Sequence, residues 1–326
     1  MKFFVTGGAG FIGSKVCQKI VAAGHEVIVY DAFIKYLPPT SLGSCDYFDV
    51  RFRDIIGKVQ FIRGDTSHKI DLYRAIKKHQ PDVCIHLAAL PIADLAFDHT
   101  DEAIQSILVG AVNVLEAIRD TACECRFLYT SSSMVYGDFL NTPCDEEHPK
   151  NPKEIYGSLK LAGETMTKAF GLRYGIDWTI VRPSAVYGPT DQNRRVTEIF
   201  LTNALQGKKV VLHGGGSNVL DFTYIDDIAE GIVLAATHPK ASGEAFNLTR
   251  GEGRSLLELV ECLKSESLEF PIEIQEQEMY RPKRGALGID KARELIGFDP
   301  KIGLEEGMRR YLEFYRIHMQ SGLIQF

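Results

Sequence analysis

The sequence predicts an α/β protein, built as a doubly wound parallel sheet followed by a smaller C-terminal α/β lobe. Three observations predict this fold. A glycine-rich turn directly follows the first apolar run, and further short apolar runs alternate with helical patterns. Polar residues stand at the ends of these runs, where ligands gather on such sheets. The expected strands lie at 3–6, 26–30, 59–62, 81–89 and 126–130.

The first stretch is a strand that runs into a tight turn and then a helix. Its glycines have the spacing G-x-G-x-x-G counted from Gly8, or G-x-x-G-x-x-G counted from Gly7, and the helical pattern continues to Gly24. Glycine permits a sharp turn and lets a pyrophosphate approach bare N–H groups at a helix N-terminus. We therefore expect a dinucleotide at this turn. Its expected contacts are Gly7, Gly10, Phe11, Ile12 and Gly13.

The ends of the next strands supply further cofactor contacts. Asp31 ends the second strand, where a carboxylate accepts both ribose hydroxyls and repels a 2′-phosphate, which favours NAD over NADP. The alternative is a plain turn residue. An acidic residue after the third strand lies near an adenine, and small residues after the fourth leave space for the cofactor. The expected contacts there are Asp65, Thr66, Leu87, Ala88 and Ala89.

The segment 32–56 is expected to be a long loop with a short helix. It either borders a ligand or forms a solvated connection, and its candidate contacts are Tyr36, Tyr47, Arg51 and Arg53. Amphipathic helices are expected at 71–79 and 100–119. The second has an apolar stripe wide enough to pack on the sheet and on a partner subunit.

A well-delimited helix is expected to begin at Pro152, with Asn151 as its cap and Glu154 completing a capping box, and to end before Gly175. Tyr156 and Lys160 are four residues apart and so share one face. A neighbouring ammonium lowers the pKa of a phenol, whose ordinary value is about 10. With a Ser hydroxyl from the preceding strand end, the pair would form an acid/base unit. The alternative is a surface pair.

Composition limits the classes of partner. The net charge of −6 argues against a nucleic-acid-binding face. Seven scattered cysteines without paired C-x-x-C spacing predict reduced thiols and no metal site. The first residues enter a core strand, and no apolar run approaches membrane-spanning length. We expect a soluble, cytoplasmic protein without nucleic-acid or membrane partners.

The periodicity changes near Arg182, which divides the chain into 1–181, a cofactor domain, and 182–326, mainly a substrate lobe. Segments near 218–248 are expected to return to the first domain. The lobe would close over the substrate and exclude water. The triple glycine at 214–216 is expected to form a turn. Helices are expected at 193–207, 226–237, 255–264, 290–295 and 304–319, and strands at 209–212 and 246–248.

Together these residues resemble the extended short-chain dehydrogenase/reductase family, in particular its NAD-dependent nucleotide-sugar epimerases and dehydratases. The resemblance covers almost the whole chain and implies a Rossmann fold, NAD, a nucleotide-sugar substrate and a homodimer paired through helices 100–119 and 156–173. The matching stretches are 7–13, Asp31, 64–65, 86–89, 131–137, 156–160, 182–189 and 221–227.

The family resemblance implies a role for each central residue. Tyr156 would take the proton from a sugar hydroxyl as hydride passes to NAD, and Lys160 would hold the nicotinamide ribose. Ser132, three residues before Val135, would bind the reacting oxygen, and Ser133 would contact the substrate. A 4-keto sugar would turn over and take the hydride back, which inverts C4 of a UDP-sugar, either a hexose or a uronic acid.

The sequence departs from the family pattern at several positions. Dehydratases place an Asp-Glu pair where Ser133 and Met134 stand here, and decarboxylating members carry Glu in the second place. These two differences argue against elimination and decarboxylation. The remaining reactions are epimerisation and simple oxidation or reduction of a sugar or small carbonyl compound. A binding protein without chemistry is disfavoured by the acid/base trio. Two Asn and one Arg of the family are replaced by Ile107, Ala185 and Leu220.

Three arginines remain as candidates to bind a diphosphate or a sugar carboxylate. Arg recognises such oxyanions with two parallel hydrogen bonds. Arg281 matches a diphosphate-binding position of the family, whereas Arg194 and Arg195 either bind substrate or lie in a solvated loop.

Overall fold

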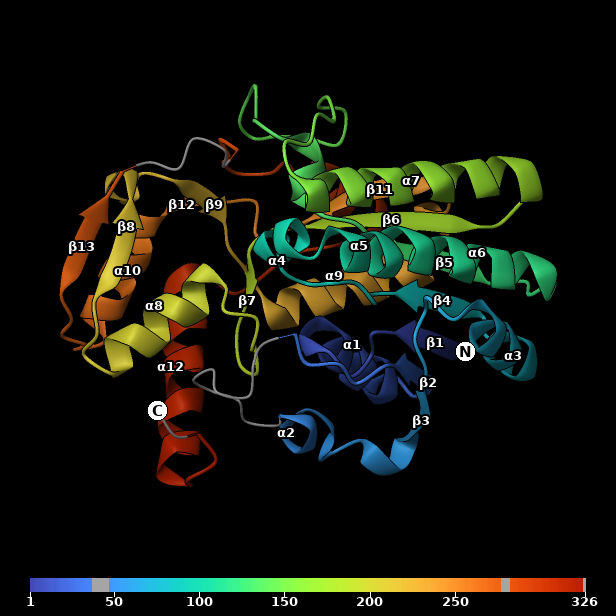
Figure 1. The fold of residues 1–326 in the computed structure, drawn as a ribbon, viewed down its shortest axis with the longest axis horizontal. Helices are drawn as coiled ribbons and strands as arrows, with labels where there is room; N and C mark the ends of the chain where they lie inside the picture. The colour runs from blue at the N-terminus through green and yellow to red at the C-terminus, as the bar shows by residue number, and fades with distance from the viewer. Residues whose placement is uncertain (37–46, 277–281, 325–326) are drawn as a thin grey trace.

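The computed structural model describes residues 1–36, 47–276 and 282–324. Its centre is a seven-stranded sheet in the order β11-β6-β5-β4-β1-β2-β3, with every neighbouring pair parallel (Figure 1). The chain runs outward from β1 to β3 and then returns to β4 beside β1, which creates a switch point where ligands bind. The predicted fold class is confirmed. The strands are β1 Lys2–Thr6, β2 Glu26–Asp31, β3 Val59–Arg63, β4 Val83–His86, β5 Arg126–Thr130, β6 Trp178–Pro183 and β11 Glu244–Leu248.

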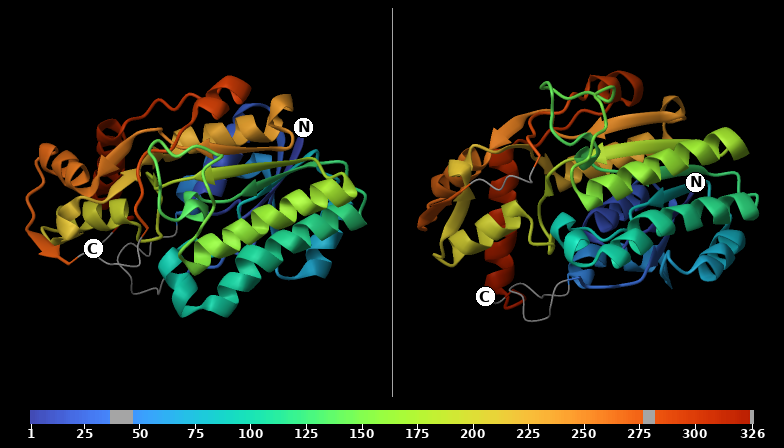
Figure 2. Two further views of the ribbon diagram at one scale, coloured as in Figure 1. Left: turned by 90° about the horizontal axis from the view of Figure 1, so that it is seen from above. Right: turned by 45° about the horizontal axis from the view of Figure 1, so that its top comes forward.

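Helices cover both faces of this sheet because its strands are apolar on both sides. Phe3 and Val5 of β1 belong to a core shared with α1 (Phe11–Ala22) and α9 (Ile225–Thr237). Phe4, between them, points to the other face. That face is covered by α3 (Lys69–His79), α6 (Gly110–Asp120) and α7 (Ile155–Tyr174). Figure 2 shows α6 and α7 side by side along the outside.

The helix predicted at 100–119 is interrupted. It consists of α5 (Thr100–Ala103), a π-helical turn (Ile104–Val109) and α6. At the interruption, Ser106 Oγ accepts the Leu90 N–H at 3.1 Å. Gly110 packs so closely that a Cβ there would lie 2.6 Å from Thr66 Oγ1. The wider turn therefore brings this helix against two of the loops at the carboxyl edge of the sheet.

The predicted start of α7 is wrong. The N-cap is Glu154, with extended backbone, and its side chain makes no capping hydrogen bond. Asn151 packs against Gly137 instead, since a Cβ on Gly137 would lie only 2.0 Å from the backbone carbonyl oxygen of Asn151. The 151–153 segment therefore packs on the preceding loop instead of opening the helix. The end is as predicted, with Gly175 in the left-handed region at φ 71°.

In the described residues of the C-terminal part there are three two-stranded sheets, β7–β10, β8–β13 and β9–β12. Each of these strands is two to four residues long, too short for a periodicity signal, and only β8 was predicted. The helix predicted at 255–264 is α10, and its start has a capping box, formed by Ser255 and Glu258, that was not predicted. The bounds are β7 Val186–Tyr187, β8 Val210–His213, β9 Val219–Asp221, β10 Thr223–Tyr224, β12 Gly253–Ser255, β13 Ile272–Gln275, α2 Phe48–Phe52, α4 Ala93–Asp98, α8 Val196–Leu205, α10 Leu256–Ser265, α11 Asp290–Ile296 and α12 Leu304–Gln320.

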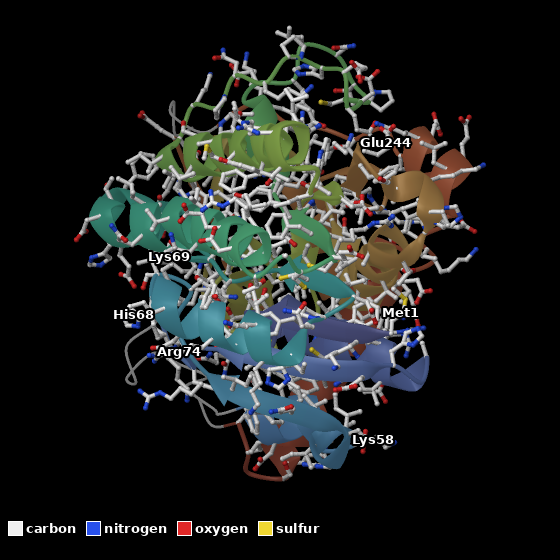
Figure 3. The ribbon with its side chains drawn as sticks, turned by 90° about the vertical axis from the view of Figure 1, so that its right-hand side faces the viewer. Met1, Lys58, His68, Lys69, Arg74 and Glu244 are labelled. Carbon is white, nitrogen blue, oxygen red and sulfur yellow. The ribbon has the colours of Figure 1, made fainter. Side chains whose placement is uncertain are left out.

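The predicted division at 181/182 stays a prediction, and two elements bear on it. β6 continues through Pro183, and β11 pairs with β6 in the central sheet after the chain has passed through β7 to β10. Figure 3 looks at the amino edge of the sheet, where Met1, Lys58 and Glu244 mark the starts of β1, β3 and β11. Among the described helices, none is both long and apolar enough to cross a membrane.

Candidate functional site

A cavity of about 1870 Å³ opens at the carboxyl edge of the sheet, between the sheet and the C-terminal elements. Most of the site residues expected from the sequence line it, whereas Arg281 lies outside the described residues. Those that line it are Gly7, Gly10, Phe11, Ile12, Gly13, Asp31, Asp65, Thr66, Leu87, Ala88, Ala89, Ser132, Ser133, Tyr156, Lys160, Arg194 and Arg195.

The glycine-rich turn is packed so that only glycine fits two of its positions. Gly7 has φ +69°, and a Cβ there would lie 2.6 Å from the backbone nitrogen of Ala88. A Cβ on Gly13 would lie 2.2 Å from the carbonyl oxygen of Gly7. The turn therefore lies directly against the end of β4 and presents bare backbone at the start of α1.

Asp31 is held by the turn that it faces. Its Oδ2 accepts the Ala9 N–H at 2.9 Å, and its Oδ1 accepts the Phe33 N–H at 2.7 Å. Burial raises the pKa of Asp31, and these two N–H groups and Arg51 oppose the rise. Each carboxylate oxygen has a second lone pair, so both can still accept a hydroxyl.

The loop after β3 is fixed by a residue that the sequence analysis missed. Asn113, buried on α6, donates its side-chain N–H groups to the carbonyl oxygens of Thr66 at 2.8 Å and Ser67 at 3.2 Å. Nearby, burial and the carboxylates of Glu102, Asp65 and Asp31 raise the pKa of Tyr36 to about 12. These three carboxylates therefore lie close enough to Tyr36 to disfavour its phenolate.

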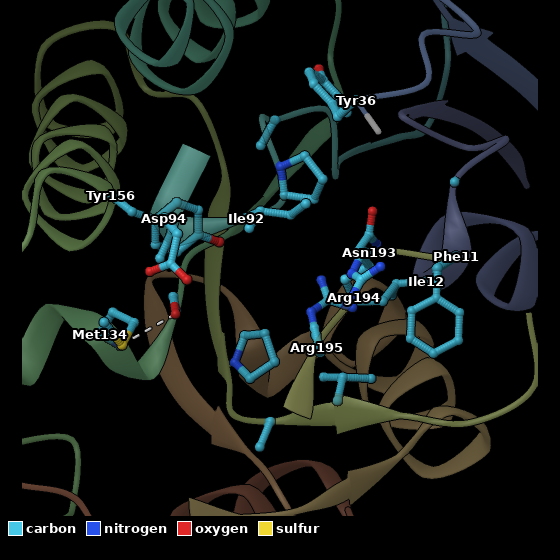
Figure 4. A pocket seen from close by; sticks show the side chains of 18 of the residues that line it. Phe11, Ile12, Tyr36, Ile92, Asp94, Met134, Tyr156, Asn193, Arg194 and Arg195 are labelled. Carbon is cyan, nitrogen blue, oxygen red and sulfur yellow. Dashed lines mark hydrogen bonds between the residues drawn. The ribbon is translucent and has the colours of Figure 1, made fainter. Parts of the chain in front are cut away.

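Ser132, Tyr156 and Lys160 meet on one wall of the cavity. Ser132 follows β5, and its Oγ accepts the Met134 N–H at 3.2 Å. The Nζ atom of buried Lys160 donates to the Thr130 carbonyl at 2.8 Å and lies 5.7 Å from the centre of the Tyr156 ring. Figure 4 shows Tyr156, Asp94 and Met134 on the same side of the cavity.

Burial dominates the ionisation of both members of the pair. It lowers the pKa of Lys160 to about 7, and Glu164 opposes this. Burial also raises the pKa of Tyr156, opposed by the Arg195 charge and a hydrogen bond from Ser132. The predicted lowering of the Tyr156 pKa by Lys160 is therefore wrong for this structure, because desolvation outweighs the nearby cations.

A buried polar network lies behind Lys160, and the sequence analysis did not predict it. Glu164, one turn further along α7, accepts Ser131 Oγ at 2.6 Å. It also accepts Arg182 Nε at 2.8 Å and Nη2 at 2.7 Å. Arg182 donates in addition to the Tyr136 hydroxyl at 2.8 Å. In the sequence, the feature that could have indicated this network is a glutamate four residues after Lys160, on the same face of the helix.

The loop between β7 and α8 carries the two described candidate arginines. Arg195 donates from Nη1 to both carboxylate oxygens of fully buried Asp191, at 3.1 and 3.2 Å. Its guanidinium lies 5.8 Å from the centre of the Phe11 ring. Arg194 is exposed with φ +48°. Figure 4 shows both arginines near Phe11 and Ile12.

The positions that depart from the family pattern have different surroundings. Leu220 and Ala185 line the cavity, whereas Ile107 is packed in a small core with Leu90 and Ala103. Met134 is contacted by a residue that the sequence analysis missed, since Arg284 Nη1 lies 3.5 Å from its Sδ. Asp94 and Glu154 are two further missed residues of the lining.

Of the segment expected to border a ligand, Tyr36 and Arg51 line the cavity. Tyr47 is buried in the core, and Arg53 is exposed. Among the described residues, no group of three or more His, Cys, Asp or Glu side chains is arranged to hold a metal ion.

Comparison with known proteins is consistent with this geometry. Residues 3–249 match the model of the NAD-dependent epimerase/dehydratase family. The chain is 30% identical to a UDP-glucose 4-epimerase of Mycolicibacterium smegmatis, across 97% of this chain and 99% of that one. It is also 30% identical to a putative UDP-glucose 4-epimerase of Methanocaldococcus jannaschii, across 96% and 97% of the two chains.

Among solved structures, the fold resembles the UDP-glucuronic acid 4-epimerase of Bacillus cereus in complex with UDP-glucuronic acid and NAD. The TM-score is 0.88 with 27% identity, across 97% of this chain and 99% of that one. A UDP-glucose 4-epimerase of Thermotoga maritima with UDP-glucose gives a TM-score of 0.88 with 26% identity, across 98% and 100%. The chain thus belongs to the NAD-dependent epimerase/dehydratase family.

Proposed function

We propose that the protein inverts C4 of a UDP-sugar, a hexose or a uronic acid, through a transient 4-keto intermediate. The observation that carries this proposal is the meeting of Ser132, Tyr156 and Lys160 on one wall of a cavity that also contains the glycine-rich turn. The activities named for relatives that match nearly the whole chain support it.

The residues of the cavity fit NAD. Gly7 packs against the Ala88 backbone and Gly13 against Gly7, and this packing holds bare backbone at the start of α1, where a pyrophosphate would lie. Asp31 would bind the adenosine ribose, and Lys160 the nicotinamide ribose. When bound, NAD supplies the acceptor for a hydride from the sugar.

The protein's own groups would handle the proton. The Ser132 hydroxyl would hold the reacting oxygen while the Tyr156 phenolate removes its proton and later returns it. Burial opposes ionisation of that phenol, and Arg195 is the cation that counters the effect. Lys160 contributes mainly position, because the Thr130 carbonyl fixes its Nζ.

Arginine side chains and small polar groups would bind the rest of the substrate. Arg194 and Arg195 line the cavity near the glycine-rich turn, and we assign them to the diphosphate, together with Arg281 on the basis of the sequence. Ser133 would contact the sugar. Leu220 stands where the family has an arginine, so the cations beside α8 would carry more of the charge.

The same replacement favours a second candidate, an NAD-dependent dehydrogenase or reductase of a sugar or small carbonyl compound. Proton NMR in D2O, with UDP-hexoses and UDP-uronic acids and no added cofactor, separates the two. A C4 epimer without deuterium on carbon supports the epimerase. Deuterium at C3 or C5 contradicts it, and so does turnover only with added NAD and accumulation of NADH.

We also infer a homodimer through α6 and α7, which lie side by side on the outside of the fold (Figure 2). Leu172 and Tyr174, both on α7, are 92% and 46% exposed, and Ile104, in the π-helical turn before α6, is 38% exposed. Apolar side chains of this size are typical of a covered surface. Light scattering after size-exclusion chromatography that showed only monomer at micromolar concentration would refute the dimer.

A cytoplasmic location is likewise inferred. The six cysteines within the described ranges are all buried free thiols, as expected in a reducing compartment. Fractionation of the source cells followed by immunoblotting tests this, and recovery in a secreted fraction would contradict it.

A further inference from the structure

The loop from β7 to α8 has a strained backbone at two positions. Thr190 has φ +73° and Arg194 has φ +48°, both in the left-handed region. A β-branched residue such as threonine is a strong outlier there, and such a conformation persists only where surrounding contacts hold it. The contacts that hold Thr190 therefore decide how this loop presents its arginines.

Arg51 holds Thr190 and the cofactor turn with one guanidinium. Its Nη2 donates to the Thr190 carbonyl at 2.6 Å, and its Nε to Thr190 Oγ1 at 3.3 Å. Its Nη1 donates to the Ala9 carbonyl in the glycine-rich turn at 3.0 Å. The planar fork of arginine suits this task, because its N–H groups point in fixed directions.

The backbone of Arg51 is also fixed. Its N–H donates to the Tyr47 carbonyl at 2.8 Å, and its carbonyl accepts the side chain of Gln18 on α1 at 2.5 Å. The Arg51 guanidinium thus connects the glycine-rich turn to the loop that contains Thr190, and the helix that carries it, α2, is hydrogen-bonded to α1.

The far side of the strained loop is organised around Asp191. Its Oδ1 accepts the backbone and the side-chain N–H groups of Asn193, both at 3.2 Å, in addition to Arg195. The Tyr311 hydroxyl of α12 lies 3.5 Å from the Asp191 carbonyl. The conformation of Thr190 is therefore transmitted directly to Asn193, Arg194 and Arg195, which Figure 4 shows at the cavity.

We propose that Arg51 is a positioning residue that couples the binding of NAD to the binding of a nucleoside diphosphate sugar. A pyrophosphate on the glycine-rich turn would fix the Ala9 carbonyl and with it the guanidinium. The guanidinium would then hold the loop that contains Thr190 in the conformation in which Arg194 and Arg195 can bind the diphosphate of the nucleotide sugar. Each ligand orders a connection that the other also needs, so each strengthens the binding of the other. This inference rests on the proposed nucleotide-sugar function.

The test measures NAD release from the holoenzyme. Protein loaded with isotopically labelled NAD is chased with unlabelled NAD, with and without saturating uridine diphosphate. In the wild type we expect uridine diphosphate to slow release by about fivefold or more. In Arg51→Gln that ratio should fall to near one. The matched control is Arg53→Gln, at an exposed arginine two residues away, and should keep the wild-type ratio.

Two further variants protect the test against misfolding. Arg51→Lys keeps the charge without the fork, and Thr190→Ala removes the hydroxyl contact but keeps the carbonyl contact, so both should give intermediate ratios. A merely structural role for Arg51 would speed NAD release equally with and without uridine diphosphate and leave the ratio unchanged.

The outcomes are distinct. If uridine diphosphate does not bind the wild type in calorimetry, the nucleotide-sugar function and this inference both fail. If it binds and slows NAD release equally in the wild type and Arg51→Gln, only the role of Arg51 is refuted. If it binds the wild type without changing NAD release, the coupling itself is refuted.

Discussion

The Nζ atom of Lys160 and the carbonyl oxygen of Thr130 lie 2.8 Å apart, and this hydrogen bond joins α7 to the end of β5. It gives a buried ammonium one fixed acceptor inside the fold, beside the phenol of Tyr156. The acid/base pair is therefore set by the packing of a helix on the sheet, not by a flexible loop, and this rigidity makes its variants interpretable.

Tyr156→Phe should bind NAD normally and lose turnover by about 10²–10⁴-fold, the usual contribution of a general acid or base. The ring remains, so the packing around Lys160 is kept. Initial rates with a UDP-sugar and calorimetry with NAD measure the two effects. Near-normal turnover would show that another group moves the proton.

Gly7→Ala should abolish NAD binding and destabilise the fold, because φ is +69° and the new Cβ would meet Ala88 at 2.6 Å. Gly24→Ala is the matched control, since φ is +79° there but no atom of the residues that the structure describes lies within 4 Å of the added Cβ. It should cost about 1–2 kcal/mol from its backbone conformation alone and keep NAD binding. Equal losses of NAD affinity in the two variants would contradict the close packing argument.

Glu164→Gln should lower the free energy of unfolding by about 3–5 kcal/mol, because it leaves Arg182 buried without its carboxylate partner. Arg182 and Glu164 are 1% and 2% exposed and pair at 2.7 Å. Glu313→Gln, at an exposed side chain of α12, should change stability by less than about 0.5 kcal/mol. Urea unfolding of both variants measures this, and a Glu164→Gln protein as stable as the wild type would exclude an important ion pair.

Glu198→Gln should stabilise the protein progressively as the pH rises from 5 to 8. Glu198 is buried, and its Oε2 lacks a hydrogen-bond partner among the described residues. Burial together with Asp191 raises the pKa of Glu198 to about 8. Between the pKa of this carboxyl in the unfolded chain and its raised pKa in the folded protein, Glu198 is protonated in the folded state and ionised in the unfolded state. The free energy of unfolding of the wild type therefore falls as the pH rises, by at most about 1.4 kcal/mol per pH unit. The glutamine variant lacks this loss. The measurement is the urea midpoint of the wild type and of Glu198→Gln at pH 5 and at pH 8. An equal change of the midpoint between the two pH values in both proteins would contradict the prediction.

Features that depend on local sequence could be predicted. The glycine spacing at the first turn, Asp31 at a strand end, and Tyr156 and Lys160 four residues apart are all specified by neighbouring residues, and the structure places them on one cavity. The same local rules failed at Asn151, because its carbonyl oxygen packs against Gly137 and the helix starts later.

Features that depend on contacts between distant segments could not be predicted. Arg51 meets Thr190, and Arg284 meets Met134, across more than a hundred residues of chain. No spacing rule links such partners. The ionisation of Tyr156 was misjudged for a related reason, since the burial that raises the pKa of its phenol depends on the whole cavity.

The position of β11 has a consequence for synthesis of the chain. β11 covers the edge of β6, and the ribosome makes it only after the segments between residues 183 and 244, several of which line the cavity. A nascent chain that has just released β6 therefore carries a sheet with an open edge, which is a template for pairing with other chains. Completion of the sheet must wait for the C-terminal half, so a translation product that stops near residue 183 would be a substrate for chaperones and proteases.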